Sequence, residues 1–454
     1  MTGPLVIDGA AIATVDSRGT EYATGHLVVH DGRISSVGSG PAPIVAGASR
    51  VDARGCLLTP GLVNTHQHLY QWVTRGLAVD ATLFGWLTEL YPVWARFTSE
   101  VVEAAAAAGL AWLAKSGCTT STDHHYLFPR GGGDVLASTV DAAARVGLRF
   151  HPTRGSMDLG QSQGGLPPDS VVESLDAILE ASQDAVTRFH DPSPGAMVRV
   201  GLAPCSPFSV SADLLRESAA LARSLNVRLH THLAETLDEE QFCQAKFGCS
   251  PVEYLDRLDW LGEDVWLAHG VHLAPAEIAR LGATGTGVAH CPSSNGRLGA
   301  GVAPSRALLD AGVPVGLGVD GAASQEAGRL VDELRQALYA ARNRDGAGPT
   351  ALTAREALAM ATIGGARCLG RADEIGSLEP GKLADLALWR MDGLGHAGIA
   401  DPVAALVFGA APPLELLTVG GRVVVERDEL RTADEASLAA DLTRACATVR
   451  EVAA

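Results

Sequence analysis

Hydrophobic and polar residues alternate with a period of two at both ends of the chain. Near the N-terminus the pattern covers residues 5–7, 11–15, 26–29 and 34–37, and near the C-terminus it covers residues 384–389 and 416–419. Such alternation is typical of β-strands that bury one face. Asp31-Gly32 and Gly420-Gly421 stand between apolar runs and predict hairpin turns. We therefore expect one small β-domain that is assembled from both ends of the chain.

The middle of the chain has a different and regular pattern. Short apolar runs typical of buried strands lie at residues 62–66, 119–123, 148–151, 198–203, 228–232, 265–269, 287–290 and 313–319. Helical stretches separate them, and three have capping-box starts at Ser170-x-x-Glu173, Ser250-Pro-x-Glu253 and Thr353-x-x-Glu356. Eight strands that alternate with helices predict an α/β fold with a parallel sheet, and eight is the number that closes a (β/α)8 TIM barrel. An open, doubly wound sheet has the same periodicity.

These patterns divide the chain into three segments. Residues 1–58 are expected to form the N-terminal part of a β-sandwich domain, and residues 59–371 the catalytic barrel. Residues 372–454 are expected to complete the β-sandwich and to end in a helix. No glycine-rich nucleotide-binding loop follows any of the predicted strands, which argues against dinucleotide and nucleoside-triphosphate sites.

Charge narrows the class of partner. The chain of 454 residues has 35 basic and 52 acidic side chains, a formal net charge of −17. This balance disfavours binding to nucleic acid, which requires a basic surface. No apolar stretch reaches the ~20 residues of a membrane span. The eight cysteines are scattered, and residues 1–4 lack the basic start of a secretory signal. We expect a cytoplasmic protein that acts on a small molecule.

Polar residues capable of acid–base and metal chemistry follow the predicted strands. The first strand ends in His66-Gln67-His68, the fifth in His230-Thr-His232-Leu-Ala-Glu235, and the sixth, seventh and eighth in His269, His290 and Asp320. Each residue alone is more often a hydrogen-bonded core histidine or a turn aspartate. In a TIM barrel, however, the C-terminal ends of all strands meet at one opening. Imidazole and carboxylate groups gathered there predict a metal site.

Two further motifs give the chain a resemblance to a known family. Pro60-Gly-Leu-Val-Asn-Thr-His66-Gln-His68 resembles the start of the amidohydrolase superfamily barrel, and Gly376-Ser-Leu-Glu-Pro-Gly-Lys-Leu-Ala-Asp385-Leu resembles the return of that family into its small domain. The resemblance covers essentially the whole chain. It implies a metal ion that activates a water molecule. Four ligands would hold this ion: His66, His68, His232 and Asp320. It further implies that Glu235 shuttles protons, that His269 orients or deprotonates the water, and that Asp320 accepts its proton.

The scarcity of lysine distinguishes between branches of that family. Two-metal members usually bridge the ions with a carboxylated lysine after the fourth strand, but here that strand ends in Ala203-Pro-Cys-Ser206. The only lysines are Lys115, Lys246 and Lys382. A site with one divalent metal ion is therefore expected. Its ligands suit Zn²⁺ and also accept Fe²⁺.

The segments 153–160, 164–170, 194–200 and 203–209 resemble the bacterial 8-oxoguanine deaminase subgroup. That resemblance implies hydrolytic deamination of an oxidised purine base, 8-oxoguanine to urate and ammonia, by a homodimer. Guanine, isocytosine, an oxidised pterin and an aminotriazine stay open as substrates. Candidate substrate contacts are Gln67, Trp86, His125 and Arg154. The subgroup has an Asn-Asp pair where this chain has Gln325-Glu326, so the rim of the pocket is expected to differ. A non-catalytic scaffold would show gaps in the metal site, whereas the four ligand positions and His269 are all filled.

Overall fold

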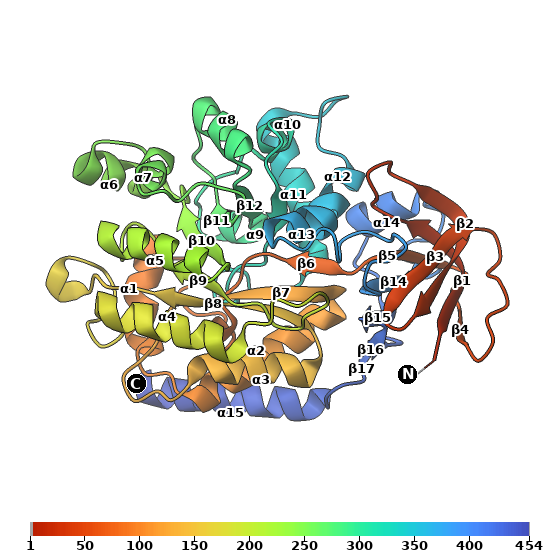
Figure 1. Cartoon of the computed structure of the whole chain (residues 1–454), viewed down its shortest axis with the longest axis horizontal. Helices are drawn as coiled ribbons and strands as arrows, with labels where there is room; N and C mark the ends of the chain where they lie inside the picture. The colour runs from red at the N-terminus through yellow and green to blue at the C-terminus, as the bar shows by residue number, and fades with distance from the viewer. Residues whose placement is uncertain (1–2, 454) are drawn as a thin grey trace.

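The computed structural model describes residues 3–453 and contains a closed eight-stranded parallel barrel (Figure 1). Neighbouring strands pair in chain order around it, and the last strand pairs with the first. The predicted barrel is therefore confirmed, and each predicted strand run overlaps one barrel strand. The strands are β6 (Leu62–Asn64), β7 (Cys118–His125), β8 (Arg149–Ser156), β9 (Gly201–Pro204), β10 (Arg228–Leu233), β11 (Val265–His269), β12 (Gly287–His290) and β13 (Val315–Leu317).

Helices cover the outside of the barrel because their apolar faces pack on strands that are buried on both sides. The larger outer helices are α2 (Ser99–Lys115), α3 (Val135–Val146), α4 (Leu175–Phe189), α5 (Ala212–Ser224), α8 (Pro275–Thr284) and α11 (Leu330–Asp345). Shorter ones are α7 (Pro251–Arg257), α9 (Pro292–Arg297), α10 (Ser305–Asp310), α12 (Ala354–Ala359), η3 (Met360–Gly364) and α13 (Gly365–Cys368). Segments that extend the strand ends contain η1 (Leu69–Thr74), α1 (Leu83–Trp94), η2 (Gln161–Gln163) and α6 (Leu237–Phe247).

Two of the three predicted helix starts are confirmed. The Ser250 side chain caps α7 by accepting a hydrogen bond from the backbone of Glu253, and Thr353 and Glu356 form the reciprocal capping box of α12. The predicted start at Ser170 is wrong, because α4 begins only at Leu175 and is capped by Ser174. Glu173, the residue expected to close that box, instead pairs with the Arg154 guanidinium.

Strands from both ends of the chain form a second, nine-stranded mixed sheet. Its order is β17-β16-β15-β14-β5-β1-β2-β3, and β4 also pairs with β1. The strands are β1 (Leu5–Ala13), β2 (Glu21–His30), β3 (Arg33–Ser39), β4 (Ser49–Asp52), β5 (Cys56–Pro60), β14 (Leu386–Arg390), β15 (Leu414–Val419), β16 (Arg422–Glu426) and β17 (Glu429–Leu430). Both predicted hairpins are present, and their two central residues have the positive φ angles that such turns require.

The sheet and the barrel are in direct contact. Strand β5 continues through Gly61 into β6, and Gly61 lies so close to Thr119 that a Cβ would be 2.2 Å from its side chain. The segment after α14 (Pro402–Phe408) returns to the sheet, and the last helix, α15 (Glu435–Ala453), then runs back along the barrel beside α2 (Figure 1). Within the described residues, no helix is long and apolar enough to cross a membrane.

Candidate metal centre and active site

The predicted metal ligands meet at one opening of the barrel. His66 and His68 follow β6, His232 lies near the end of β10, and Asp320 follows β13. The Asp320 Oδ1 atom is 3.4 Å from His66 Nε2 and 3.3 Å from His68 Nε2. His68 Nε2 is also 3.2 Å from His232 Nε2. Nitrogen and oxygen atoms from three separate strand ends therefore converge on one point.

Hydrogen bonds determine which nitrogen of two imidazoles carries the proton. His68 Nδ1 lies 2.7 Å from the carbonyl oxygen of His124, and His232 Nδ1 lies 2.7 Å from that of Cys205. A carbonyl oxygen only accepts, so both Nδ1 atoms are protonated. Burial lowers the pKa of both rings, to about 3 for His68, so both are neutral. Their Nε2 lone pairs consequently face each other, an arrangement that a metal ion would satisfy.

A second histidine determines the protonation of His66. His230 Nδ1 donates to the carbonyl oxygen of Trp266 at 2.7 Å, which leaves His230 Nε2 as an acceptor. His66 Nδ1 lies 2.8 Å from that atom and must therefore carry a proton. The remaining atom, His66 Nε2, is buried, has no hydrogen-bond partner among residues 3–453, and points to the same site. The sequence pattern included His230 but gave no reason for its presence.

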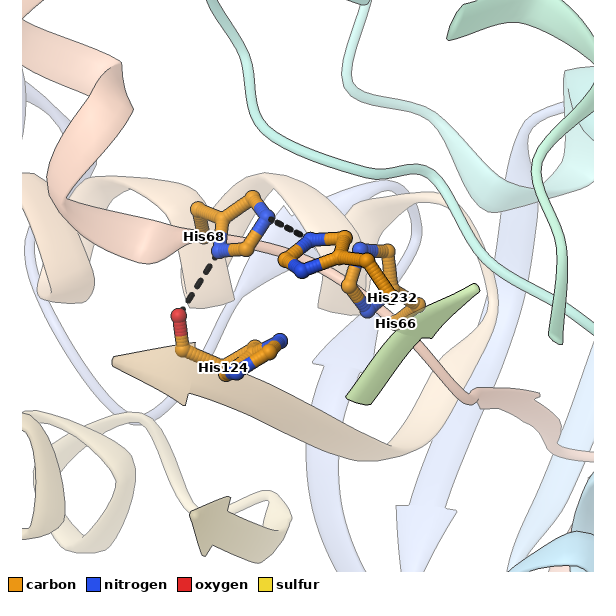
Figure 2. A group of neighbouring side chains, drawn as sticks. All are labelled: His66, His68, His124 and His232. Atoms are coloured by element: carbon orange, nitrogen blue, oxygen red, sulfur yellow. Dashed lines mark hydrogen bonds between the residues drawn. The ribbon is translucent and has the colours of Figure 1, made fainter. Parts of the chain in front are cut away.

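The donor set fits one divalent cation. The ligand atoms of His66, His68, His124 and His232 all lie within 4.8 Å of one another (Figure 2). The ligand atoms of His66, His269 and Asp320 lie within the same distance of one another. Neutral imidazoles and a carboxylate are ligands that zinc accepts. None of the three lysines follows β9: Lys115 ends α2, Lys246 lies in α6 and Lys382 precedes β14.

His124 belongs to this cluster, although the sequence directed attention to its neighbour His125. His124 Nε2 lies 3.0 Å from the carbonyl oxygen of Ala203, so its unpartnered Nδ1 holds the lone pair. The ring stacks on that of His232 with centroids 4.6 Å apart. Alternation along β7 was the available signal, because Thr122 and His124 share one face of the strand and His125 lies on the other.

Asp320 is held as an anion. Its Oδ2 atom accepts hydrogen bonds from Ser294 (2.5 Å) and Ser324 (3.1 Å), and Oδ1 accepts one from the backbone of Gly321 at 2.7 Å. Burial raises the pKa of Asp320, but its proximity to the imidazoles of His66, His269 and His68 outweighs burial and holds that pKa well below its usual range. This carboxylate can therefore bind a cation or accept a proton.

The pKa of Glu235 is shifted in the opposite direction, upwards. Burial raises the pKa of its carboxyl group, and only the charge of His269 opposes that effect substantially. Glu235 Oε2 is 3.7 Å from His269 Nε2, while His269 Nδ1 lies 2.9 Å from Asn295 Oδ1. Burial lowers the pKa of His269, but the carboxylates of Glu235 and Asp320 raise it above its ordinary value. Two carboxyl groups whose pKa values are displaced in opposite directions are suited to separate acid and base roles.

The backbone is strained where it presents these groups. Ala234, His269 and Asp320 all have positive φ angles, of 52°, 76° and 59°. Non-glycine residues adopt this conformation at a cost of roughly 1–2 kcal/mol each. Three such residues at three strand ends of one site indicate that the fold maintains an unfavourable backbone to aim the side chains.

An aromatic cavity opens above the metal-ligand cluster. Trp86 lies in its wall and donates from Nε1 to the carbonyl oxygen of Ala323 at 3.0 Å. The cavity is lined by His68, Gln71, Leu83, Trp86, Leu87, Tyr91, Tyr126, Cys205, Ser206, Phe208, His232, Glu235, Glu239, His269, Leu298 and Asp320. Flat apolar walls with a few polar groups are typical of a site for a heteroaromatic ring.

The three other candidate substrate contacts are not among the lining residues. Gln67 donates to Ser121 Oγ at 3.4 Å, and His125 Nε2 bonds to the carbonyl oxygen of Leu127 at 2.8 Å. The Arg154 guanidinium makes two 2.8 Å hydrogen bonds to Glu173 and lies over the Phe128 ring. Arg154 thus has a complete set of structural partners outside the cavity.

Gln71 is a wall residue that the sequence interpretation did not identify. Its Oε1 atom accepts a hydrogen bond from the backbone of Ala323 at 3.3 Å. This contact orients the amide and leaves Nε2 buried with no partner in the described part of the chain. The signal was a lone amide in the apolar run of residues 69–74.

Gln325 and Glu326 stand where the 8-oxoguanine deaminase subgroup has an Asn-Asp pair. Gln325 Nε2 donates to Glu333 at 2.7 Å, and the Glu326 carboxylate pairs with Arg297 at 2.9 Å. Neither residue lines the cavity. His290 is also absent from the lining set; it is buried, and burial lowers its pKa to about 4.

Comparisons with known proteins agree with this geometry. The pattern of the amidohydrolase family matches residues 57–424. The chain is 51% identical over 402 residues to the 8-oxoguanine deaminase of Pseudomonas aeruginosa, which covers 88% of this chain and 89% of that protein. It is 40% identical to an isoxanthopterin deaminase from an unknown prokaryotic organism, with 93% and 92% covered. The crystal structure of atrazine chlorohydrolase from Arthrobacter aurescens TC1, complexed with zinc, superposes with a TM-score of 0.92 at 34% identity, covering 97% and 100%.

Proposed function

This chain belongs to the amidohydrolase family, and we propose that it hydrolyses 8-oxoguanine to urate and ammonia. The observation that carries the proposal is the pairing of Glu235 and Asp320 in one aromatic cavity, with pKa values displaced in opposite directions beside a cluster of metal-binding imidazoles. The similarity to the Pseudomonas aeruginosa enzyme supports the choice of substrate.

We assign the metal to His66, His68, His232 and Asp320. These residues would hold a divalent ion, which we take to be zinc, and such an ion would lower the pKa of water towards about 7. The protonated Nδ1 atoms of His68 and His232 hold those rings in place through backbone carbonyls. The bond from His66 to His230 does the same for the third ring.

The protein groups then move the protons. Asp320 accepts the proton released by the attacking water, with Oδ1 facing the site and Oδ2 held by the two serines. Glu235, whose raised pKa lets it hold a proton near neutral pH, delivers one to the ring nitrogen beside the attacked carbon. The proton that Asp320 took from the water then passes to the amino group, which leaves as ammonia, while Glu235 regains a proton from the new hydroxyl group as it becomes the carbonyl of urate. His269 orients the water and stabilises ionised Glu235 after transfer.

Gln71 supplies the contact that distinguishes an oxo-purine. Gln71 lines the cavity, the backbone of Ala323 holds its amide, and its Nε2 is a buried donor without a partner among residues 3–453. A carbonyl oxygen on the substrate would satisfy that donor, and an analogue without one would leave it buried and unpaired at a cost of about 1–3 kcal/mol. Trp86, Tyr126 and Phe208 provide the flat walls for the ring. We therefore assign to Gln71, and not to Arg154, the hydrogen bond to the substrate carbonyl.

Isoxanthopterin, guanine, isocytosine and an aminotriazine are the competing substrates, because relatives act on heterocycles of this kind. The test measures ammonia release by the metal-loaded protein across this panel. We expect 8-oxoguanine to have the highest kcat/KM and Glu235→Gln to abolish turnover while leaving metal content unchanged. Activity on another base with none on 8-oxoguanine would overturn the substrate assignment.

Matched variants test the role of Gln71 separately from the choice of substrate. Gln71→Leu should lower kcat/KM for 8-oxoguanine by roughly tenfold or more, with a smaller effect on bases that lack the carbonyl. Arg154→Met serves as the control. The Arg154 guanidinium lies outside the cavity, so this variant should change stability more than selectivity.

We also propose a cytoplasmic homodimer; the eight free cysteines agree with a reducing compartment.

A further inference from the structure

A second polar cavity lies at the end of the barrel opposite the metal cluster. It opens beside the N-terminal ends of β9, β10 and β11, where Gly201, Arg228 and Trp266 line it. His151 of β8 and the segment that follows α13 complete the wall. The cavity has a volume of about 230 Å³. Polar groups at this end of a TIM barrel generally serve stability, so charges left unpaired there require an explanation.

Three arginines gather around this cavity. Arg199 and Arg371 share one carboxylate, that of Glu374, at 3.0 and 2.6 Å. Arg228 has no carboxylate within salt-bridge distance in the described part of the chain; its Nη2 donates to the carbonyl oxygen of Glu263. Two of the three guanidinium groups therefore share one carboxylate, and the third bonds to a backbone carbonyl.

Acidic groups also lie near these arginines. Asp264, which lines the cavity, accepts from Arg223 at 3.0 Å. The charges of Asp191 and Glu263 act on Arg199 and Arg228. The cavity is therefore distinguished by its guanidinium donors and not by an excess of positive charge.

Several buried donors around the cavity lack partners. Arg199 Nε, Arg228 Nε and Arg371 Nη1 have no hydrogen-bond acceptor among residues 3–453, and His151 Nε2 has no hydrogen-bond partner there. His151 lines the cavity and is only 4% exposed. Buried polar groups in native proteins are generally satisfied, and a cluster of unsatisfied donors indicates a missing acceptor.

The electrostatics agree with a missing anion. Burial lowers the pKa of Arg371 to about 10, and repulsion by Arg199 adds to the effect. Burial also lowers the pKa of Arg228, and burial and three neighbouring arginines lower that of His151. The His190 side chain accepts from the backbone of Val200 through Nδ1, which leaves its Nε2 as a further donor. A cation could not accept hydrogen bonds from these groups, whereas an anion could.

We propose that this cavity is an anion site that binds a phosphate group between Arg228, Arg199 and His151. Guanidinium forks match the oxygen geometry of phosphate, and phosphate carries close to two negative charges near neutral pH. Inorganic phosphate and the phosphate of a small monoester have this same chemistry, and the cavity has room for either.

The site is also in contact with the metal cluster through one side chain. The Trp266 indole lines the cavity, and its ring stacks on His230 with centroids 4.4 Å apart. His230 in turn holds His66. Occupancy of the cavity can therefore be followed through tryptophan fluorescence as well as by heat.

The experiment titrates the metal-loaded full chain with inorganic phosphate, and separately with ribose 5-phosphate, by calorimetry at constant ionic strength. We expect saturable binding that Arg199→Gln, on the rim, weakens by about tenfold, the value of one charge-assisted hydrogen bond. Arg216→Gln, an exposed arginine on α5, is the matched control and should bind as the parent does. Tighter binding of ribose 5-phosphate than of phosphate would identify a monoester as the ligand.

Two results would overturn the proposal. One is no saturable heat with either phosphate probe. The other is unchanged phosphate affinity in Arg199→Gln and in Arg228→Gln, which would place the anion at the metal cluster. If Arg228→Gln does not fold, Arg199→Gln combined with His151→Phe gives the same comparison. Both residues lie away from the proposed catalytic groups, so loss of phosphate binding with normal turnover is distinguishable from loss of the active site.

Discussion

His230 illustrates how one buried side chain determines the chemistry of another. Through the carbonyl oxygen of Trp266 it is fixed with its proton on Nδ1, and His66 must then present an unprotonated Nε2. We expect His230→Phe to weaken metal binding by about 10- to 100-fold, as losses of such supporting partners do. Competition with a chelator measures the affinity.

The choice of phenylalanine keeps the stack on Trp266 and removes only the nitrogens. His30→Gln, an exposed position on the distant sheet, is the control. Unchanged metal affinity in the phenylalanine variant would mean that His66 does not depend on His230 for its protonation.

Glu333 allows the effect of burial on the pKa of a single carboxyl group to be measured through protein stability. It is fully buried on α11, and burial raises its pKa to about 7 despite hydrogen bonds from Ser293 and Gln325. The unfolded chain has the lower, ordinary pKa, so the native state binds more protons between about pH 4.5 and 7. The contribution of Glu333 to stability is therefore present below this window and is lost as pH rises through it.

Compared with Glu333→Gln, the parent should lose roughly 3 kcal/mol of unfolding free energy between pH 4.5 and 8, because a shift of one pKa unit corresponds to about 1.4 kcal/mol. Urea denaturation across that range measures the difference. The exposed Glu217→Gln serves as the reference and should give a flat profile. A difference between parent and Glu333→Gln that does not vary with pH would contradict the assignment.

At the scale of residues, the sequence predicts those side chains whose placement follows from their near neighbours in the chain. His66 and His68 are predicted to bind one metal ion because alternate residues at a strand end share one face, and the family resemblance adds His232. Gln71 and His124 were missed because their roles depend on contacts with Ala323 and Ala203, which are distant in sequence. Arg154 was placed in the pocket because nothing nearby in sequence shows that Glu173 returns to pair with it.

At the scale of elements, the turn between β10 and α6 positions the proposed proton shuttle. Ala234 has a left-handed backbone, and the Glu239 carboxylate accepts hydrogen bonds from the backbone of Ala234 (2.9 Å) and Glu235 (3.2 Å). Both oxygens are used, so a glutamine can satisfy only one of the two donors. Glu239 is thus a positioning residue for Glu235.

We expect Glu239→Gln to lower kcat by about tenfold, since a misplaced proton donor lessens general acid catalysis, while KM and metal content stay near those of the parent. Asp238→Asn, exposed on the same helix, is the control. A rise in KM with unchanged kcat would show instead that Glu239 contributes to substrate binding.

The element pattern was predictable where periodicity alone decides it. All eight barrel strands and both hairpins follow from apolar runs and turn residues, because each is a local property of the chain. The start of α4 was not, since Ser170 and Ser174 are both competent caps and the choice depends on the engagement of Glu173 by Arg154. The single nine-stranded sheet likewise depends on pairing between β5 and β14, which are more than 300 residues apart.

At the scale of the whole molecule, one buried ion pair joins the barrel to the second sheet. Arg149 of β8 donates from Nε and Nη2 to the two oxygens of Asp385 at 2.6 and 3.1 Å, and both side chains are 2% exposed. Asp385 also accepts from the backbone of Gly420 in the hairpin between β15 and β16. Its position just before β14 connects the family motif to the packing of the two parts.

Removing the negative charge should therefore destabilise the whole fold. Asp385→Asn keeps a shape and an acceptor for Gly420 but leaves the Arg149 guanidinium buried without a counter-charge, which costs about 3–5 kcal/mol. Asp184→Asn, half of an exposed pair on α4, is the control and should cost less than about 1 kcal/mol. Chemical denaturation of the two variants gives the comparison. Equal midpoints would mean that hydrophobic contact, such as that of Trp389 over Gly117, holds the two parts together without this ion pair.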